Sequence, residues 1–153
     1  MRLVGGLAVA LCAWIGSLSA APGLVRVDVD LAAQAMRVAA DTGERYEWPI
    51  SSGSPGHETP RGIFRPTALY PMIHSYKYGN EPMPYSIFFY GQYAIHGTEA
   101  VGALGQPVSH GCIRLSPDAA ATLYALVSRE GALIQIGGAS APVDFAAEVG
   151  RSR

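Results

Sequence analysis

The sequence predicts a mostly β domain with one clear helix, and two observations carry this prediction. Several short segments alternate apolar and polar residues between glycine- and proline-rich turns, and only residues 117–130 carry both start and stop signals of a helix. The 153 residues, 49% of them hydrophobic, suit a single globular domain. The net charge of −1 argues against a nucleic-acid partner, because phosphate binding needs a basic patch.

The amino terminus has the layout of a secretory signal peptide. Arg2 precedes an apolar run over residues 3–15, and small residues gather between positions 17 and 21. A membrane anchor is the alternative, but the run contains glycines and is shorter than the ~20 apolar residues of a spanning helix. We therefore expect residues 1–20 to be a cleaved signal peptide and the mature protein to be exported.

The first half of the mature chain predicts a β-meander followed by irregular segments. Strands are expected over residues 24–30, over residues 35–40 and from Arg45 onward, with a hairpin turn at Asp41–Glu44. Glycines and prolines predict an ordered loop over residues 53–66. The aromatic and proline-rich stretch 70–86 is also expected to be irregular, and either lines a cleft or packs over a sheet edge.

The second half predicts the remaining strands and the helix. Residues 87–97 read as two short strands around a glycine, and Ser109–Leu115 read as another strand. Ser116 is a good N-cap for the helix, which Gly131 ends before a last strand over residues 132–136. We expect one domain over residues 21–137 and a peripheral tail over residues 138–153.

The mature chain is expected to keep a single cysteine, and its presence calls for an explanation. The two cysteines are Cys12 and Cys112, and removal of the signal peptide leaves only Cys112, so no internal disulfide can form. An unpaired thiol is at risk in an oxidising compartment. A buried structural thiol is the alternative to a functional one.

The residues around Cys112 favour a functional thiol. If Ser109–Leu115 is a strand, then His110, Cys112 and Arg114 share one face, and the apolar residues Ile113 and Leu115 share the opposite face, which packs on the core. His96, on a preceding strand, can face the same opening. A histidine, a thiol and a guanidinium are expensive to bury together, and this grouping therefore indicates a site.

A free thiol has a pKa of about 8.5, so Cys112 needs a base to become a nucleophile near neutral pH. His110 lies on the same strand at ~6.5 Å, which is long for proton transfer, whereas His96 can come closer from another strand. We assign His96 as the base, the Gly97 carbonyl as the group that orients it, and His110 as an orienting or oxyanion-side group. The amides near Gly111 and Cys112 are candidates for an oxyanion hole.

The stretch "IHGTEAVGALGQPVSHGCIRL" resembles the signature of the L,D-transpeptidase catalytic domain family, which has the YkuD fold. The likeness also includes "TPRGIF" and "PMPYS" and extends from Leu24 to about Ile136. It implies a sandwich-like or barrel-like β fold. It also implies Cys112 as the acylated nucleophile, His96 as its base and the Gly97 carbonyl as the group that orients the base. The supporting shell that it implies is Ser109, His110 and Gly111.

The resemblance implies an exported bacterial enzyme, in the periplasm or cell envelope, that remodels peptidoglycan. The cysteine would release D-alanine from a stem tetrapeptide and pass the acyl group to an amine, either a diaminopimelate side chain or a lysine of an envelope protein. Arg114 is expected to pair with a stem carboxylate, and Tyr85 or another loop tyrosine to help the oxyanion. No cofactor or metal is expected.

Three alternatives stay open. A carboxypeptidase would hydrolyse the acyl-enzyme on the same scaffold. A zinc site could use the cysteine and the histidines, although neither Cys-x-x-Cys nor His-Glu-x-x-His occurs. A non-catalytic envelope module would leave the reactive thiol unexplained. His57 and His74 are expected to be loop residues with hydrogen-bonding roles.

Overall fold

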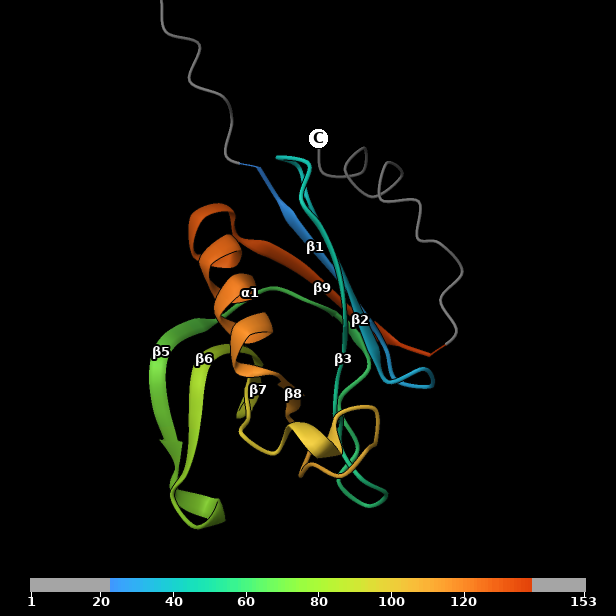
Figure 1. The fold of residues 1–153 in the computed structure, drawn as a ribbon, viewed down its shortest axis with the longest axis vertical. Helices are drawn as coiled ribbons and strands as arrows, with labels where there is room; N and C mark the ends of the chain where they lie inside the picture. The colour runs from blue at the N-terminus through green and yellow to red at the C-terminus, as the bar shows by residue number, and fades with distance from the viewer. Residues whose placement is uncertain (1–22, 139–153) are drawn as a thin grey trace, which may run out of the picture.

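The computed structural model describes residues 23–138, which form two β-sheets and one α-helix (Figure 1). The first sheet has the strand order β3(Arg45–Pro49), β2(Ala35–Ala40), β1(Val25–Asp30), β9(Ala132–Gly137), β4(Gly62–Phe64). The second has the order β5(Ala68–Ser75), β6(Glu81–Tyr90), β7(Tyr93–Gly97), β8(Ile113–Leu115). The helix is α1(Pro117–Glu130), and two short 3-10 turns are η1(Tyr76–Tyr78) and η2(Val101–Ala103).

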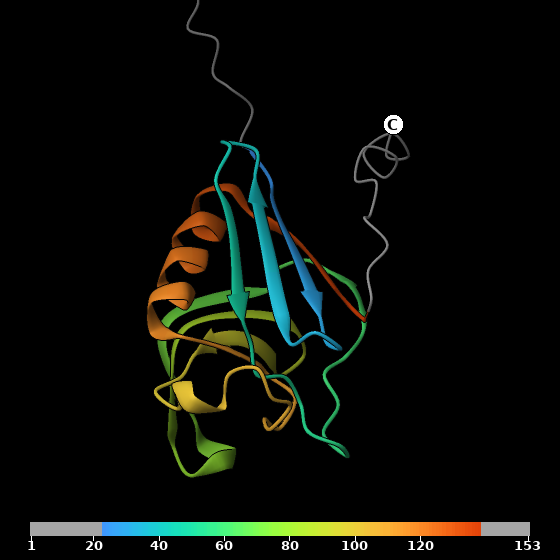
Figure 2. The ribbon, with the colours of Figure 1, turned by 45° about the vertical axis from the view of Figure 1, so that its right-hand side comes forward.

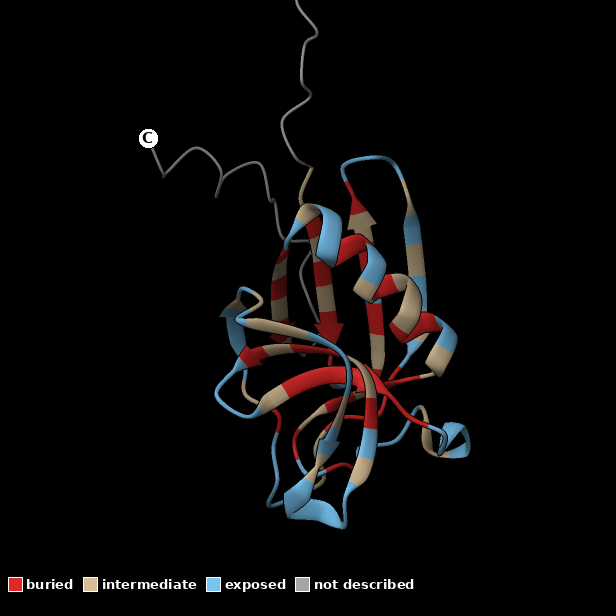
Figure 3. Ribbon diagram, turned by 90° about the vertical axis from the view of Figure 1, so that its left-hand side faces the viewer, coloured by how far each residue is buried: buried red, intermediate tan, exposed pale blue. Residues whose placement is uncertain are grey.

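The core lies where the two sheets and the helix meet. The helix α1 contacts β6 and β7 of the second sheet and β1 of the first (Figure 2). Val27 on β1, Ile95 on β7 and Leu123 on α1 are all almost completely buried and belong to one hydrophobic cluster. Buried residues therefore lie on β1, β2 and β9 of the first sheet, on β6, β7 and β8 of the second, and on one side of α1 (Figure 3).

The meander and the helix confirm the sequence prediction. β2 and β3 pair in antiparallel register around the turn predicted at Asp41–Glu44, β1 pairs with β2 in the same antiparallel sense, and β9 returns beside β1 in parallel. The Ser116 side chain accepts a hydrogen bond from the Ala119 amide at 3.3 Å and so caps α1. Gly131 follows the last helical residue at φ +69°, a conformation that favours glycine.

The expectation of irregular structure over residues 70–86 is wrong. This stretch forms most of a long β5–β6 hairpin that ends in η1. Pro82 and Pro84 lie in the part of β6 that pairs only with β5, because β7 begins its pairing further along, at residue 87. A strand tolerates proline where one side of its backbone has no partner strand.

The strand expected over Ser109–Leu115 is also shorter than predicted. Only Ile113–Leu115 form β8, and residues 109–112 form a turn in which Gly111 has φ +114°. The side chains of His110 and Cys112 are therefore not placed by strand alternation.

The predicted signal peptide and C-terminal tail lie outside the described residues. Within residues 23–138, no helix is long and apolar enough to cross a membrane.

Candidate active site

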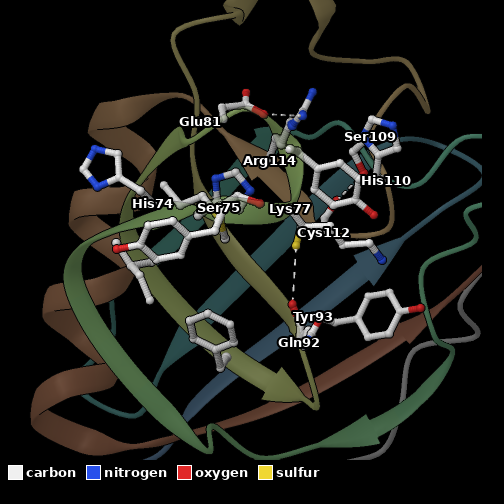
Figure 4. Close-up of a pocket in the computed structure, with 16 residues that line it drawn as sticks. His74, Ser75, Lys77, Glu81, Gln92, Tyr93, Ser109, His110, Cys112 and Arg114 are labelled. Atoms are coloured by element: carbon white, nitrogen blue, oxygen red, sulfur yellow. Dashed lines mark hydrogen bonds and ion pairs between the residues drawn. The ribbon is translucent and has the colours of Figure 1, made fainter.

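A cavity of about 590 Å³ opens beside the β5–β6 hairpin (Figure 4). Its walls come from the hairpin, from β7 and from the turn that precedes β8. Five residues predicted as site residues line this cavity: His96, Ser109, His110, Cys112 and Arg114. The fold thus brings together residues that are up to eighteen positions apart in the sequence, from His96 to Arg114.

Cys112 lies at the end of the turn, directly before β8, and its thiol is partly exposed to the cavity. The Sγ atom donates a weak hydrogen bond to the carbonyl oxygen of Gln92, at 3.9 Å (Figure 4). Burial raises the pKa of the thiol above its ordinary value, while the Ala94 amide and the Arg114 charge act in the opposite direction. The resting residue is therefore a neutral thiol, which needs a base for attack.

His96 lies on β7 and is only 3% exposed. Its Nδ1 atom is 2.8 Å from the carbonyl oxygen of Gly97. Because a carbonyl oxygen can only accept, Nδ1 carries the proton and Nε2 has a free lone pair. Burial lowers the pKa of His96, so the imidazole is neutral and able to take a proton. The orienting role predicted for the Gly97 carbonyl fits this geometry.

The close packing around Gly97 explains why a glycine follows the histidine. A Cβ atom there would lie 3.1 Å from Pro84 on β6 and 3.3 Å from the Ala120 side chain on α1. The missing side chain thus lets β7 approach the helix while its carbonyl stays beside His96.

The register of β7 against β8 relates the histidine to the cysteine. Ile95 pairs with Ile113 in parallel, so Ala94 lies opposite Cys112 and His96 lies beside Arg114. His96, on β7, and Cys112, in the turn directly before β8, line the same cavity. The hydrogen bond of the thiol, however, goes to Gln92.

Ser109 is buried and holds the turn that carries the nucleophile. Its hydroxyl donates to the carbonyl oxygen of Cys112 at 2.6 Å and accepts from the amide of Gly111 at 3.0 Å. The Gly111 amide, expected in the oxyanion hole, is therefore used inside the turn. Ser109 orients the nucleophile through the backbone, which fixes the direction in which the Cys112 side chain points.

Gly111 is required by its surroundings as well as by its backbone angle. A Cβ atom there would lie 2.5 Å from Cε1 of Tyr93, and its φ of +114° is a region that favours glycine. The Gly111 carbonyl accepts a hydrogen bond from the buried Thr59 hydroxyl at 2.9 Å, and the same hydroxyl accepts from the Gly53 amide. The loop expected over residues 53–66 is shorter than predicted, because Gly62–Phe64 form β4, and its first part stabilises the turn through Thr59.

His110 is exposed at the rim of the cavity. Its ring stacks on Tyr78 with centroids 4.3 Å apart and an interplanar angle of 13°, and meets the edge of His57 at 4.9 Å. Tyr78 belongs to η1, so this stack joins the tip of the hairpin to the nucleophile turn. His57 lies in a loop as expected, whereas His74 lies on strand β5 and lines the cavity.

Arg114 has an internal partner. Its guanidinium forms an ion pair with Glu81 at 3.2 Å, and the side chain is only 15% exposed (Figure 4). The contact of Arg114 with a stem carboxylate stays a prediction. Sequence reasoning missed Glu81, because the two residues are 33 positions apart and nothing local marks the acid.

Tyr85 differs from its expected role at the oxyanion. Its ring packs against Tyr124 of α1, with centroids 5.8 Å apart, and it is not among the residues that line the cavity. The tyrosines that do line it are Tyr76, Tyr78 and Tyr93. The backbone of Tyr85 has φ +55°, which turns the side chain away from simple strand alternation.

A zinc site would need several His, Cys, Asp or Glu side chains close together. Within residues 23–138, no three His, Cys, Asp or Glu side chains lie close enough together to hold a metal ion.

The chain belongs to the YkuD family of L,D-transpeptidase catalytic domains, because the model of that family matches residues 25–143. The match continues past residue 137, where the sequence predicts the end of the domain. A comparison with curated proteins found no match.

Solved structures support the same assignment. An L,D-transpeptidase from Mycobacterium smegmatis is 28% identical with a TM-score of 0.68, and the match covers 76% of this chain and 59% of that one. An L,D-transpeptidase from Stackebrandtia nassauensis is 28% identical with a TM-score of 0.65, covering 74% and 55%. One from Xylanimonas cellulosilytica is 26% identical with a TM-score of 0.63, covering 77% and 62%.

These matches confirm the family and the fold class predicted from the sequence. The matched region spans less than two thirds of the length of each of these solved chains.

Proposed function

We propose that this protein is an exported L,D-transpeptidase that acts on peptidoglycan stem peptides in the periplasm or cell envelope. The observation that carries the proposal is the placement of Cys112 and a carbonyl-oriented His96 in one cavity, within a chain of this family. The signal-peptide pattern at residues 1–20 supports export.

In the first half-reaction, Nε2 of His96 takes the thiol proton, and sulfur attacks the carbonyl carbon before the terminal D-alanine. The oxyanion forms beside the turn, where the Cys112 amide is the remaining donor of the predicted pair, because the Gly111 amide bonds to Ser109. His96 then gives its proton to the leaving amine, D-alanine departs, and a thioester on Cys112 remains.

In the second half-reaction, an amine attacks the thioester carbon and gives its excess proton to His96. The carbon–sulfur bond breaks, and the sulfur regains a proton from His96. A diaminopimelate side chain would give a 3-to-3 cross-link, and a lysine of an envelope protein would give an attached protein. Water in place of the amine would make the enzyme a carboxypeptidase.

The test is mass spectrometry of the mature protein incubated with a purified muropeptide tetrapeptide, with and without an added amine. The expected result is D-alanine release and an amine-dependent product, both absent with Cys112→Ala. Release giving only free tripeptide would establish a carboxypeptidase instead. No Cys112-dependent release would overturn the proposal.

A further inference from the structure

The cavity that holds Cys112 and His96 also holds an ion pair that the proposed reaction does not use. The guanidinium of Arg114 meets the carboxylate of Glu81 at 3.2 Å. Arg114 lies on β8, the strand that follows the nucleophile Cys112. Glu81 is the first residue of β6, just after the tip of the hairpin. Both side chains line the cavity (Figure 4).

The strand register places the positive charge of this pair beside the base. His96 and Arg114 are partners across β7 and β8. Partners on neighbouring strands project from the same face of a sheet, ~4.8 Å apart at the backbone. His96 must become an imidazolium when it accepts the thiol proton, and a neighbouring cation opposes that change.

Arg114 is poorly placed to find compensation from water. Its side chain is 15% exposed, and within residues 23–138 its Nε atom is buried with no hydrogen-bond partner. The Glu81 carboxylate is therefore the group that balances its charge inside the cavity. Glu81 itself is 38% exposed, so water screens its outer side, but its removal leaves the less exposed guanidinium without its charged partner.

We propose that Glu81 is a positioning residue of the acyl transfer: it holds the Arg114 guanidinium beside His96 and neutralises its charge, so that His96 can still accept the proton of Cys112. This inference rests on the proposed function, since it assigns a role within the same reaction. Glu81 acts through Arg114 and needs no contact with the substrate.

The charges of this pair act on both reacting groups, and on His96 they act in the direction that this role requires. Arg114 lowers the pKa of His96 and that of Cys112, and Glu81 raises both. Removing Glu81 thus makes His96 a weaker base at a site where burial already lowers its pKa.

Other titratable groups line the cavity and belong to the same electrostatic environment. From the hairpin come His74, Tyr76, Lys77 and Tyr78, from β7 comes Tyr93, and from the nucleophile turn comes His110. The Lys77 ammonium lies over the Tyr78 ring, 5.3 Å from its centroid. These groups are left unchanged in the test.

The test measures the pH dependence of Cys112 alkylation by iodoacetamide, which needs no peptidoglycan. Glu81→Gln is expected to shift the profile to lower pH, because Glu81 raises the pKa of the thiol, and Arg114→Gln to shift it to higher pH, because Arg114 lowers that pKa. The double variant should return close to the wild-type profile, because each change acts through the other partner. Glu81→Asp and Arg114→Lys keep the charges and should stay close to wild type.

The matched control is Glu47→Gln, which removes the same kind of carboxylate from the exposed Arg37–Glu47 pair on the first sheet. It should not move the profile. Circular dichroism identifies the variants that fold. If Arg114→Gln does not fold, Glu81→Gln is compared with the charge-keeping variants Glu81→Asp and Arg114→Lys. Shifts in the same direction for both glutamine variants, or no shift in Glu81→Gln, would overturn the inference.

A second readout separates this inference from the proposed function. In the muropeptide assay, Glu81→Gln should lower kcat several-fold with little change in KM, because it weakens the base and leaves substrate contacts intact. A wild-type protein that releases no D-alanine would overturn the proposed function, whereas the alkylation profiles test the Glu81 charge by themselves.

Discussion

The Nδ1 atom of His96 lies 2.8 Å from the carbonyl oxygen of Gly97, its own neighbour on β7. This contact fixes the tautomer of the imidazole without help from a distant side chain. The proton stays on Nδ1, and Nε2 is the atom able to accept a proton from a thiol.

Replacing His96 with asparagine separates orientation from base chemistry. An asparagine amide can still donate to the Gly97 carbonyl, but it has no equivalent of Nε2. We expect His96→Asn to fold and to lose about 10²- to 10⁴-fold in D-alanine release. The measurement is the initial rate by mass spectrometry, with His96→Ala beside it. An asparagine variant with near wild-type rate would show that the imidazole is not the base.

The burial of His96 also makes stability depend on pH. Its pKa in the folded protein lies below the ordinary value of 6.5, so the unfolded chain binds the proton more readily. The stabilisation is present above about pH 6.5 and is lost as the pH falls toward the folded-state value. The midpoint of thermal unfolding should therefore fall more between pH 7.5 and pH 5 in wild type than in His96→Asn. Equal losses in the two proteins would contradict this assignment.

Gly111 and Gly43 offer a matched pair of positive-φ glycines. Both have similar angles, +114° and +106°, but a Cβ at Gly111 would meet Tyr93 at 2.5 Å, whereas a Cβ at Gly43 has no atom within 4 Å. Either change to alanine should cost of order 1–3 kcal/mol in the free energy of unfolding through backbone strain. Only Gly111→Ala should also slow Cys112 alkylation. Chemical denaturation and alkylation rates are the measurements, and similar alkylation in both variants would argue against a packing role for Gly111.

The stack of Tyr78 on His110 should couple the hairpin to the nucleophile turn. Such a ring contact contributes about 0.5–1.5 kcal/mol, so Tyr78→Ala and His110→Ala should each lower kcat/KM by roughly 2- to 10-fold. The double variant should lose little more than either single one, because both changes remove one contact. Tyr78→Phe keeps the ring and is the control. Alkylation of Cys112 should persist in all of them; its loss in His110→Ala would make His110 the base in place of His96.

The sequence by itself determined the elements whose signals are local. Strict alternation of apolar and polar residues defines β1, since one face of this strand is buried. Ser116 and Gly131 define the ends of α1 because capping involves only neighbouring backbone groups. The Ser-His-Gly-Cys string and the preceding His-Gly identified the family, because residues close in the chain carry the site's signature.

The tertiary structure decided what depends on distant partners. Residues 70–86 look irregular by composition, yet pairing along β5 and β6 makes them a hairpin, and the prolines fit where β7 does not reach. The turn before β8 is held by Ser109 and Thr59 hydroxyls, which overrides the alternation of its side chains. Arg114 meets Glu81 across 33 positions and His110 meets Tyr78 across the cavity rim, because folding places surfaces together that no local pattern connects.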